Sequence, residues 1–321
     1  MATPHRYPLI FNPKARSQRG QQALRFLMER ANQFALYATN DGAEARELAA
    51  RFAAAGEPVV IAAGGDGTLN AVVCGLAGTA TALAVLPTGT MNVFARELGI
   101  PCAHLGRALE VIERGFVREI DLFEANHAPF VQLAGIGFDA RVIEETTWER
   151  KKALGVLAYL LAAVRVLGDR PPPMVVECAD GRRETGVAVL VGNGALYGGP
   201  LRFFHKADNQ DSKLDLLIYK EPGYRLVLDS LRGLAAGGIH LMEGISYLQT
   251  ESCVVRAEVE TPVEVDGELL GRFKEVRFAP AASRLRVVAP EEPFPGRFAG
   301  TLKTLRSWTP WAAAAVSPRT P

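Results

Sequence analysis

A glycine-rich turn carries the clearest chemistry in this sequence. Residues 64–68 read Gly-Gly-Asp-Gly-Thr, directly after a run of apolar residues and directly before a pattern typical of a helix. Glycines let the chain turn tightly, and they let a phosphate approach the amide groups at the helix start, which have no partner within the helix. Thr68 and Asn70 can reach the same ligand. The turn indicates an anion site, with a tight turn that merely caps a helix as the alternative.

Asp66 needs a different role, because a carboxylate would repel a phosphate. Carboxylate oxygens are ligands that suit Mg²⁺. We therefore expect Asp66 to hold Mg²⁺ against the phosphates or to accept hydrogen bonds from backbone amides.

Three further polar turns follow apolar segments of the sequence. They are residues 12–16 (Asn-Pro-Lys-Ala-Arg), Thr39 after the segment 36–38, and residues 87–92, which include Thr90. In an open parallel sheet, the loops after the carboxyl ends of the strands gather at one edge, where ligands bind. We therefore expect all four turns to converge.

The elements that must position these turns alternate in the first third of the chain. The patterns predict strands at 7–11, 58–63 and 82–86, and helices at 21–35, 43–55, 68–76, 92–98 and 103–114. Strands and helices that alternate at this spacing indicate βαβ units and a mostly parallel sheet. We expect a doubly wound α/β nucleotide-binding domain over residues 1–120.

Short alternating segments dominate after residue 119 and predict antiparallel strands. These strands are expected at 174–178, 185–191, 214–219, 253–259, 262–265, 276–278 and 285–288, with helices at 148–167 and 224–236. Such a pattern is typical of a β-sandwich. We expect an all-β sandwich-like domain over residues 121–290. The tail, 291–321, is expected to be partly disordered or packed back on the first domain.

Composition excludes several classes of protein. The chain has 321 residues, a net charge of +1 and 48% hydrophobic residues, which fits a globular protein without a field that attracts nucleic acid. Its 4 cysteines form no CxxC pair, and its 5 histidines are scattered, so a zinc or histidine metalloenzyme is not expected. The start of the chain lacks a signal peptide, and the apolar segment 153–167 is short for a bilayer span. These features favour the cytoplasm.

Seven motifs together resemble the diacylglycerol kinase catalytic-domain family, in its bacterial lipid kinase branch, which is related to sphingosine kinase. They are N-P-K-A-R at 12–16, G-G-D-G-T-L-N at 64–70, P-T-G-T-M-N-V-F-A-R at 87–96, G-I-G-F-D-A at 135–140, G-N-G-A-L-Y-G-G at 192–199, D-S-K-L-D at 211–215 and V-D-G-E at 265–268. They occur in the family's order and span both expected domains.

The resemblance implies a nucleotide-binding domain, a β-sandwich domain and an active site between them. It also implies phosphoryl transfer from ATP to a lipid hydroxyl, such as that of diacylglycerol or a sphingoid or ceramide lipid. Carried over residue by residue, it assigns the ATP contacts to Asn12, Pro13, Lys14, Ala15, Arg16, Thr39, Gly64, Gly65, Asp66, Gly67, Thr68, Leu69, Asn70 and Thr90.

The second domain would supply the catalytic base. Glu268 matches the family's proton acceptor, and Gly267 places it at a hairpin tip. Asp266 competes for the same role, and Asp66 would act beside the phosphates. Because phosphoryl transfer has a loose transition state, positioning should matter more than base strength. The alternative is a hairpin turn whose acids are only solvated.

The resemblance also implies a structural Mg²⁺ site, with Asp208, Asp211 and the carbonyl group of Lys213 as ligands. Ser212 replaces the family's usual glycine there, and the acids could instead fill a polar turn. Near the cleft, Tyr197 lies in a glycine-rich loop that either shapes the acceptor pocket or has no function.

Two other functions compete with a lipid kinase: an NAD kinase, which also has a GGDGT turn, and a non-catalytic nucleotide-binding protein. We expect ATP and Mg²⁺ as cofactors, a membrane lipid as substrate and no nucleic acid partner. Contact with the inner membrane face would be peripheral. A homodimer is an alternative to a monomer.

Overall fold

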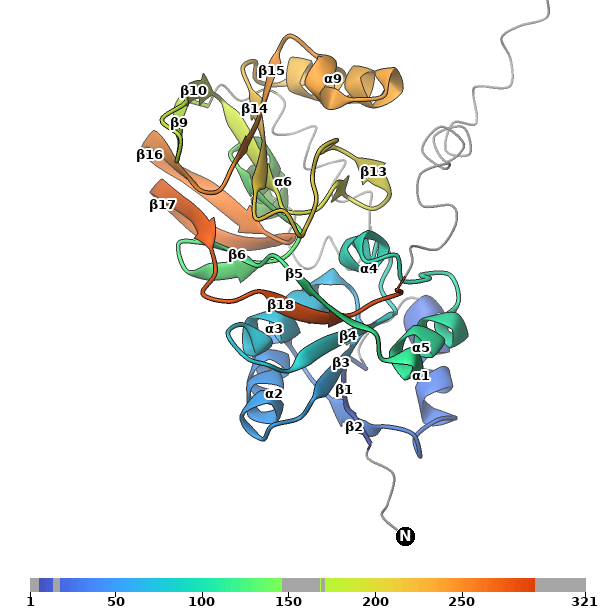
Figure 1. Ribbon diagram of the computed structural model, residues 1–321. Coiled ribbons are helices and arrows are strands. Elements are labelled where there is room, and N and C mark those ends of the chain that lie inside the picture. The colour runs from blue at the N-terminus through green and yellow to red at the C-terminus, as the bar shows by residue number, and fades with distance from the viewer. Residues whose placement is uncertain (1–5, 14–17, 146–167, 169–170, 292–321) are drawn as a thin grey trace, which may run out of the picture.

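The computed structural model describes residues 6–13, 18–145, 168 and 171–291, arranged around two large sheets (Figure 1). The first sheet has the strand order β2-β1-β3-β4-β18-β5. Its strands are β1 (Pro8–Phe11), β2 (Ala35–Ala38), β3 (Val59–Gly64), β4 (Ala82–Pro87), β5 (Val117–Ile120) and β18 (Leu285–Val288). All neighbouring pairs are parallel except β18 with β5.

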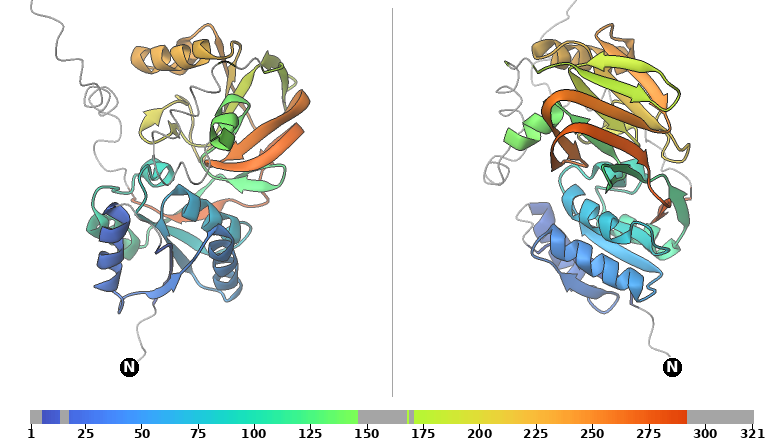
Figure 2. Two further views of the ribbon diagram at one scale, coloured as in Figure 1. Left: turned by 180° about the vertical axis from the view of Figure 1, so that it is seen from behind. Right: turned by 90° about the vertical axis from the view of Figure 1, so that its left-hand side faces the viewer.

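Helices cover both faces of this sheet. They are α1 (Gln18–Met28), α2 (Gly42–Ala54), α3 (Asp66–Leu76), α4 (Val93–Glu97) and α5 (Leu105–Arg114). Figures 1 and 2 show α2 and α3 on one face and α1 and α5 on the other. Every residue of β4 is buried, as expected for a strand covered on both sides. The doubly wound, mostly parallel sheet predicted from the sequence is confirmed.

The second sheet is antiparallel, and its main path runs β15-β14-β11-β8-β16-β17-β6-β7, with β9 and β10 beside it. Its strands are β6 (Phe123–Ala125), β7 (Ala128–Phe130), β8 (Leu133–Ile136), β9 (Met174–Cys178), β10 (Arg183–Gly186), β11 (Ala188–Gly192), β14 (Leu214–Tyr219), β15 (Ile245–Thr250), β16 (Cys253–Val265) and β17 (Glu268–Pro280). A two-stranded ribbon, β12 (Leu196–Tyr197) with β13 (Leu201–Arg202), lies apart.

Strand β16 bends this sheet into a sandwich-like shape. Its first half pairs with β9 and its last residues pair with β8, so two strands share one edge of β16. The register with β17 shifts between Arg256 and Thr261, which is where the strand changes partner. Helices α6 (Phe138–Glu145) and α9 (Tyr224–Ala236) and the 3₁₀ turn η1 (Ile239–Leu241) complete this part. The expected sandwich-like second domain is confirmed.

Two of the differences from the sequence prediction concern the first sheet. Helix α1 ends at Met28, and residues 35–38 form the edge strand β2 on β1, where the pattern predicted a helix to residue 35. Strand β18, in the range expected for the second domain, returns to the first sheet between β4 and β5. The predicted helix at 148–167 lies outside the described residues, and so does the tail beyond Glu291. Among the described helices, none is long and apolar enough to cross a membrane.

Candidate functional site

The glycine turn lies at the carboxyl end of β3, and helix α3 begins at Asp66, within it. Gly65 is the N-cap residue, in an extended conformation. A side chain at Gly89, in the loop after β4, would overlap the backbone of Gly65. Gly64 also lacks room for a side chain, because Thr68 packs against it. The glycines therefore let two loops touch at the helix start, where the unpaired amides favour an anion.

Asp66 joins this turn to the next helix. Its Oδ1 accepts a hydrogen bond from the backbone N–H of Val93, at the start of α4, over 2.8 Å. Burial raises the pKa of Asp66, and amides of Val93, Phe94 and Asn92 oppose the rise. Of the two roles expected for this carboxylate, acceptance from backbone amides is the one that the structure describes.

Asn92 has a positioning role that the sequence reasoning did not find. It is buried and left-handed, with φ +49°. Its Oδ1 accepts from the N–H of Gly89 over 2.9 Å, and its Nδ2 donates to the carbonyl of Gly89 over 2.8 Å. The side chain therefore closes the loop that touches the glycine turn. An asparagine that ends a glycine-containing loop is the available signal for such a closure.

The two candidate bases, Asp266 and Glu268, have different surroundings. Oδ2 of Asp266 accepts from Asn70 Nδ2 over 3.0 Å and from the N–H of Val131 over 2.9 Å. Its Oδ1 accepts from the N–H groups of residues 132 and 133 over 2.9 and 3.0 Å. Burial raises the pKa of Asp266, and these four bonds oppose the rise. A carboxylate with four donors is already committed, so Asp266 has a structural function here.

Glu268 remains exposed at the start of β17 and faces the first domain. A methyl group added to Gly67 would lie only 3.1 Å from Glu268 Oε1. The carboxylate thus sits against the first turn of α3, which comes from the other sheet. The absence of a side chain at Gly67 permits this approach.

A cavity of about 610 Å³ connects these groups. Its polar lining includes Asp66, Asn70, Thr90, Gln132, Asp139, Tyr197, Glu264, Asp266 and Glu268. Its apolar lining comprises Leu69, Met91, Val93, Phe94, Val131, Leu133, Phe138, Val142 and Ile143. An apolar cavity with a few convergent polar groups is typical of a small-molecule site.

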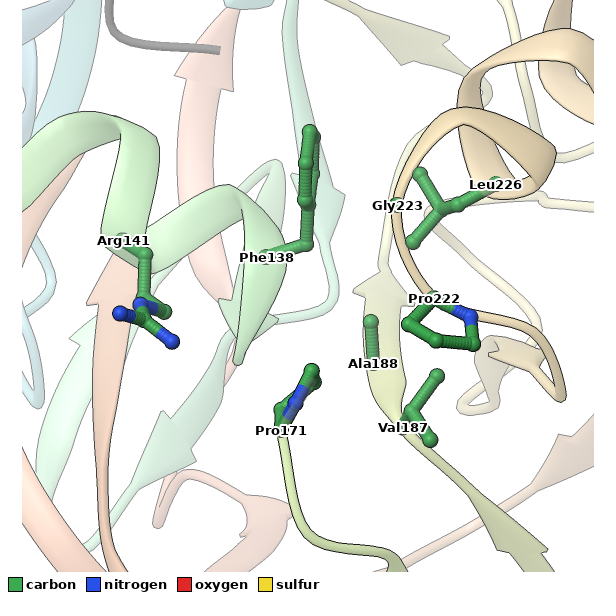
Figure 3. A pocket seen from close by; sticks show the side chains of 8 residues that line it. All are labelled: Phe138, Arg141, Pro171, Val187, Ala188, Pro222, Gly223 and Leu226. Atoms are coloured by element: carbon green, nitrogen blue, oxygen red, sulfur yellow. The ribbon is translucent and has the colours of Figure 1, made fainter. Parts of the chain in front are cut away.

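Figure 3 shows a second, much smaller pocket, of about 10 Å³, lined by Phe138 and by Leu226 of α9 among others. Such a volume holds about one water molecule. Phe138 also lines the large cavity, so this residue borders both pockets.

A buried network of acids lines the large cavity and was missed from the sequence. Tyr197 donates its hydroxyl to Oδ1 of Asp139, and Glu264 Oε2 accepts from the N–H of Gly267 over 2.8 Å. Among the described residues, Oε1 of Glu264 is buried without a hydrogen-bond partner, and burial raises the pKa of both Asp139 and Glu264. A glutamate between the buried Val263 and Val265 is the signal that could have found it.

The other predicted nucleotide contacts divide into three groups. Asn12 and Thr39 follow β1 and β2, at the same sheet edge as the glycine turn. The buried Thr39 is committed to the backbone, because its N–H and hydroxyl both donate to the carbonyl of Phe11, over 2.9 and 3.3 Å. Gly65, Asp66, Gly67, Leu69, Asn70 and Thr90 line the cavity. Pro13 is exposed, and Lys14, Ala15 and Arg16 lie outside the described residues.

The residues predicted to hold a structural Mg²⁺, Asp208, Asp211 and Lys213, lie in one turn directly before β14. Oδ1 of Asp208 accepts from the N–H of residue 210 over 3.1 Å, and Oδ1 of Asp211 accepts from the N–H of Lys213 over 3.0 Å. Both carboxylates thereby close local turns. The guanidinium of Arg284 lies at the same turn, where it donates to the carbonyl of Gln210 over 2.7 Å and pairs with the buried Asp121 over 2.8 Å. Within the described ranges, no group of three or more His, Cys, Asp or Glu could hold a metal.

Two family models match the chain. One is described as the diacylglycerol kinase catalytic domain and covers residues 6–125. The other is described as the YegS C-terminal NAD kinase beta sandwich-like domain and covers residues 133–289. The first match covers β1 to β5 of the first sheet, and the second covers most of the second sheet together with β18.

Whole-chain similarities agree with these models. The chain is 32% identical to a "probable lipid kinase YegS-like" protein of Pseudomonas aeruginosa, over 88% of this chain and 93% of that protein. It is 29% identical to a diacylglycerol kinase of Bacillus subtilis, over 88% and 96%. A crystal structure described as a diacylglycerol kinase of Bacillus anthracis superposes with a TM-score of 0.71 at 26% identity, over 89% and 97%.

Proposed function

Because the chain belongs to the diacylglycerol kinase catalytic-domain family, we propose that it transfers the γ-phosphoryl group of ATP to a primary hydroxyl of a membrane lipid. The observation that carries the proposal is the position of Glu268. Its carboxylate comes from the second sheet and lies against the glycine turn that begins α3. A phosphate donor at that turn would thus face a proton acceptor.

The nucleotide side of the site rests on the turn and on the helix start. Backbone amides at residues 65–67 and the positive end of α3 would bind the phosphates. Mg²⁺ that arrives with ATP would neutralise charge on the transferring phosphoryl group. Asp66 is our candidate to contact that ion or its water molecules.

On the acceptor side, the lining of the cavity favours an uncharged headgroup. Five carboxyl groups line it: Asp66, Asp139, Glu264, Asp266 and Glu268. In the part of the chain that the structure describes, the lining includes no Lys, Arg or His. A lipid that already carries a phosphate would be repelled by these carboxylates, because like charges at short range disfavour each other. We therefore propose diacylglycerol, or another uncharged lipid alcohol, ahead of phosphatidylglycerol.

The proposed reaction breaks one bond to phosphorus and forms another. The lipid oxygen attacks the γ-phosphorus, the bond from phosphorus to the β–γ bridging oxygen breaks, and ADP leaves. The hydroxyl proton passes to the carboxylate of Glu268. Because the transition state is loose, the placement of Glu268 matters more than its basicity.

The experiment that tests this function uses ATP labelled at the γ-phosphate, Mg²⁺ and vesicles with diacylglycerol, phosphatidylglycerol or ceramide. Label in the organic phase, highest with the uncharged lipids, is the expected result. NAD is included as a competing acceptor. Label found only in dinucleotide would identify an NAD kinase, and no label in any acceptor would indicate a non-catalytic nucleotide-binding protein.

Access to such a substrate requires contact with a membrane surface. We propose peripheral contact with the inner membrane face, because the acceptor is a membrane lipid and no described helix could span the bilayer. Vesicle flotation with diacylglycerol and a nonhydrolysable ATP analogue should carry the protein upward. Protein that stays at the bottom under these conditions would contradict peripheral contact.

A further inference from the structure

The acid network in the cavity wall has hydrogen-bond donors at both ends. At one end, the hydroxyl of Tyr197 donates to Oδ1 of Asp139. At the other end, the N–H of Gly267 donates to Oε2 of Glu264 over 2.8 Å. Each carboxyl group therefore has one oxygen left for the other acid. Glu264 is fully buried, with 0% of its surface exposed.

The two remaining oxygens both lie over Gly135, and Oε1 of Glu264 has no hydrogen-bond partner among the described residues. A methyl group on Gly135 would lie 2.8 Å from Oε1 of Glu264 and 2.9 Å from Oδ2 of Asp139. Gly135 faces Glu264 across the β8–β16 ladder, so the glycine leaves the space in which the two acids meet. Two ionised carboxylates would repel each other there, and two protonated ones would place two protons between one pair of oxygens.

We propose that Asp139 and Glu264 share a single proton, and that this shared proton fixes the hairpin that presents Glu268. One proton satisfies all four carboxyl oxygens of the pair. Two oxygens accept from Tyr197 and Gly267, and of the other two, the protonated oxygen donates to the unprotonated one. The inference rests on the proposed function, in which Glu268 accepts the proton of the lipid hydroxyl.

The network acts on Glu268 through the backbone. Gly267 directly precedes Glu268, and its N–H is held by Glu264. Asp266 and Gly267 are both left-handed, with φ +48° and +86°, so the turn has a specific shape. Asp266 is fixed by its own four bonds. The pair therefore holds the backbone of the turn at Gly267, which Asp266 does not hold. Asp139 and Glu264 are thus positioning residues.

The surroundings of the pair favour retention of the proton. Burial raises the pKa of both acids. Asp139 and Asp266 add to the rise in the pKa of Glu264, whereas Glu264 lowers the pKa of Asp139. The other titratable groups that act on the pair are the hydroxyls of Tyr197 and Tyr219. None of these groups carries a positive charge.

Amide substitutions test the count of protons. In Glu264→Gln, the side-chain carbonyl accepts from Gly267 and the amide NH₂ donates to Asp139. In Asp139→Asn, the carbonyl accepts from Tyr197 and the NH₂ donates to Glu264. Each single variant keeps one donor between the acids and the same charge. The double variant places two NH₂ groups against each other, so the outer donors and the inner contact cannot all be satisfied.

We expect each single variant to phosphorylate the lipid within about threefold of the native rate, because its hydrogen bonds are conserved. The double variant should lose about tenfold or more in kcat, with KM for ATP unchanged, since a buried polar group loses its partner. A double variant as active as the single ones would overturn the proposal. So would single variants that are as impaired as the double one.

Thermal unfolding without ligand separates this test from the proposed function. A raised pKa in the folded chain means that the folded state binds the proton more tightly, so native stability should fall as pH rises above about 4.5. Glu264→Gln should flatten that fall, and an equal slope in both chains would contradict the shared proton. Failure of the native chain to phosphorylate any lipid would instead refute the proposed function and leave this slope intact.

Discussion

At the scale of single residues, Asp266 and Glu268 show how one intervening glycine separates two roles. Asp266 accepts four hydrogen bonds, one of them from Asn70 of α3, whereas Glu268 is exposed and faces Gly67. From the sequence alone, both acids were candidates for the catalytic base. A DG turn does not indicate which of the two carboxylates accepts hydrogen bonds from the protein. Only the fold brings the donors at residues 131–133 to Asp266.

Asp266→Asn should destabilise the protein. An amide presents one oxygen and one NH₂ group, so two of the four donors would meet another donor. The expected cost is about 2–4 kcal/mol, since buried donors would lose their partners. Urea unfolding followed by circular dichroism measures it. The matched change at the exposed Glu268, Glu268→Gln, should leave the free energy of unfolding within about 0.5 kcal/mol of native; equal losses in both variants would refute the assignment.

A second prediction at this scale concerns opposing titrations near Tyr247. Its hydroxyl donates to Asp215, and its ring lies 4.3 Å from that of His205. Burial raises the pKa of Asp215 from 3.8 to about 6 and lowers the pKa of His205 from 6.5 to about 4. The Asp215 contribution to stability is thus lost as pH rises from about 4 to 6, and that of His205 is lost as pH falls from about 6.5 to 4.

Each substitution should reveal the effect of the other group. Asp215→Asn should lose stability as pH falls from 6.5 to 4, and His205→Gln should lose it as pH rises from 4 to 6. The native chain should change less than either variant in this window. Melting temperatures across pH 4–7 in one buffer series provide the test, and parallel curves for the three proteins would contradict it.

At the scale of elements, the approach of helix α3 to the β16–β17 hairpin sets the site. The sequence predicted the glycine turn, the strand before it and the helix after it, because apolar periodicity and glycine punctuation are local signals. It did not predict β2 or the place of β18. Residues 35–38 form a strand because they pair with the edge of β1. Strand β18 pairs with β4, which lies about 200 residues away in the sequence. Both strands depend on tertiary contacts, which local sequence patterns do not contain.

Gly67→Ala tests the contact between these elements. The added methyl group would lie 3.1 Å from Glu268 Oε1, so the carboxylate must move. We expect kcat to fall about tenfold, as expected for a small misplacement of a reacting group, without loss of stability, because alanine favours a helix over glycine. Gly106→Ala is the matched control: Gly106 lies in α5 with nothing within 4 Å of an added methyl group. Equal activity of the two variants would refute the contact.

At the scale of the whole molecule, the chain crosses between the two sheets twice. It leaves the first sheet after β5 and returns to it as β18, between β4 and β5. Figure 1 shows β18 beside β4 and β5, below the second sheet. Leu285, Val287 and Val288 of this strand are buried in the first core. The first sheet is therefore complete only when the last part of the second region has folded.

A fragment of residues 1–121 should consequently fail to fold alone. It lacks the strand that separates β4 from β5, so it would expose the apolar surface that β18 covers. Proton NMR and circular dichroism of the fragment should show little fixed structure, whereas the complete chain unfolds cooperatively. A well-dispersed spectrum from the fragment would contradict this dependence.

The sequence also revealed the components of the site more readily than their contacts. Gly65, Asp66 and Glu268 were found because glycine and acid patterns carry chemistry without reference to the fold. The pairing of Asp139 with Glu264 was missed, because the two acids meet only where β8 lies beside β16. The place of Arg284, which donates to the carbonyl of Gln210 and pairs with Asp121 beside the turn at 208–213, was also beyond the reach of the sequence.

The central claim, that Glu268 acts across the two domains as the proton acceptor, is tested most directly by Glu268→Gln in the labelled-ATP assay with diacylglycerol vesicles. We expect kcat to fall about 100-fold or more, with KM for ATP and the melting temperature unchanged. Glu258→Gln, at an exposed glutamate of β16, is the control and should retain native activity. Native kcat in the Glu268→Gln variant would contradict the account.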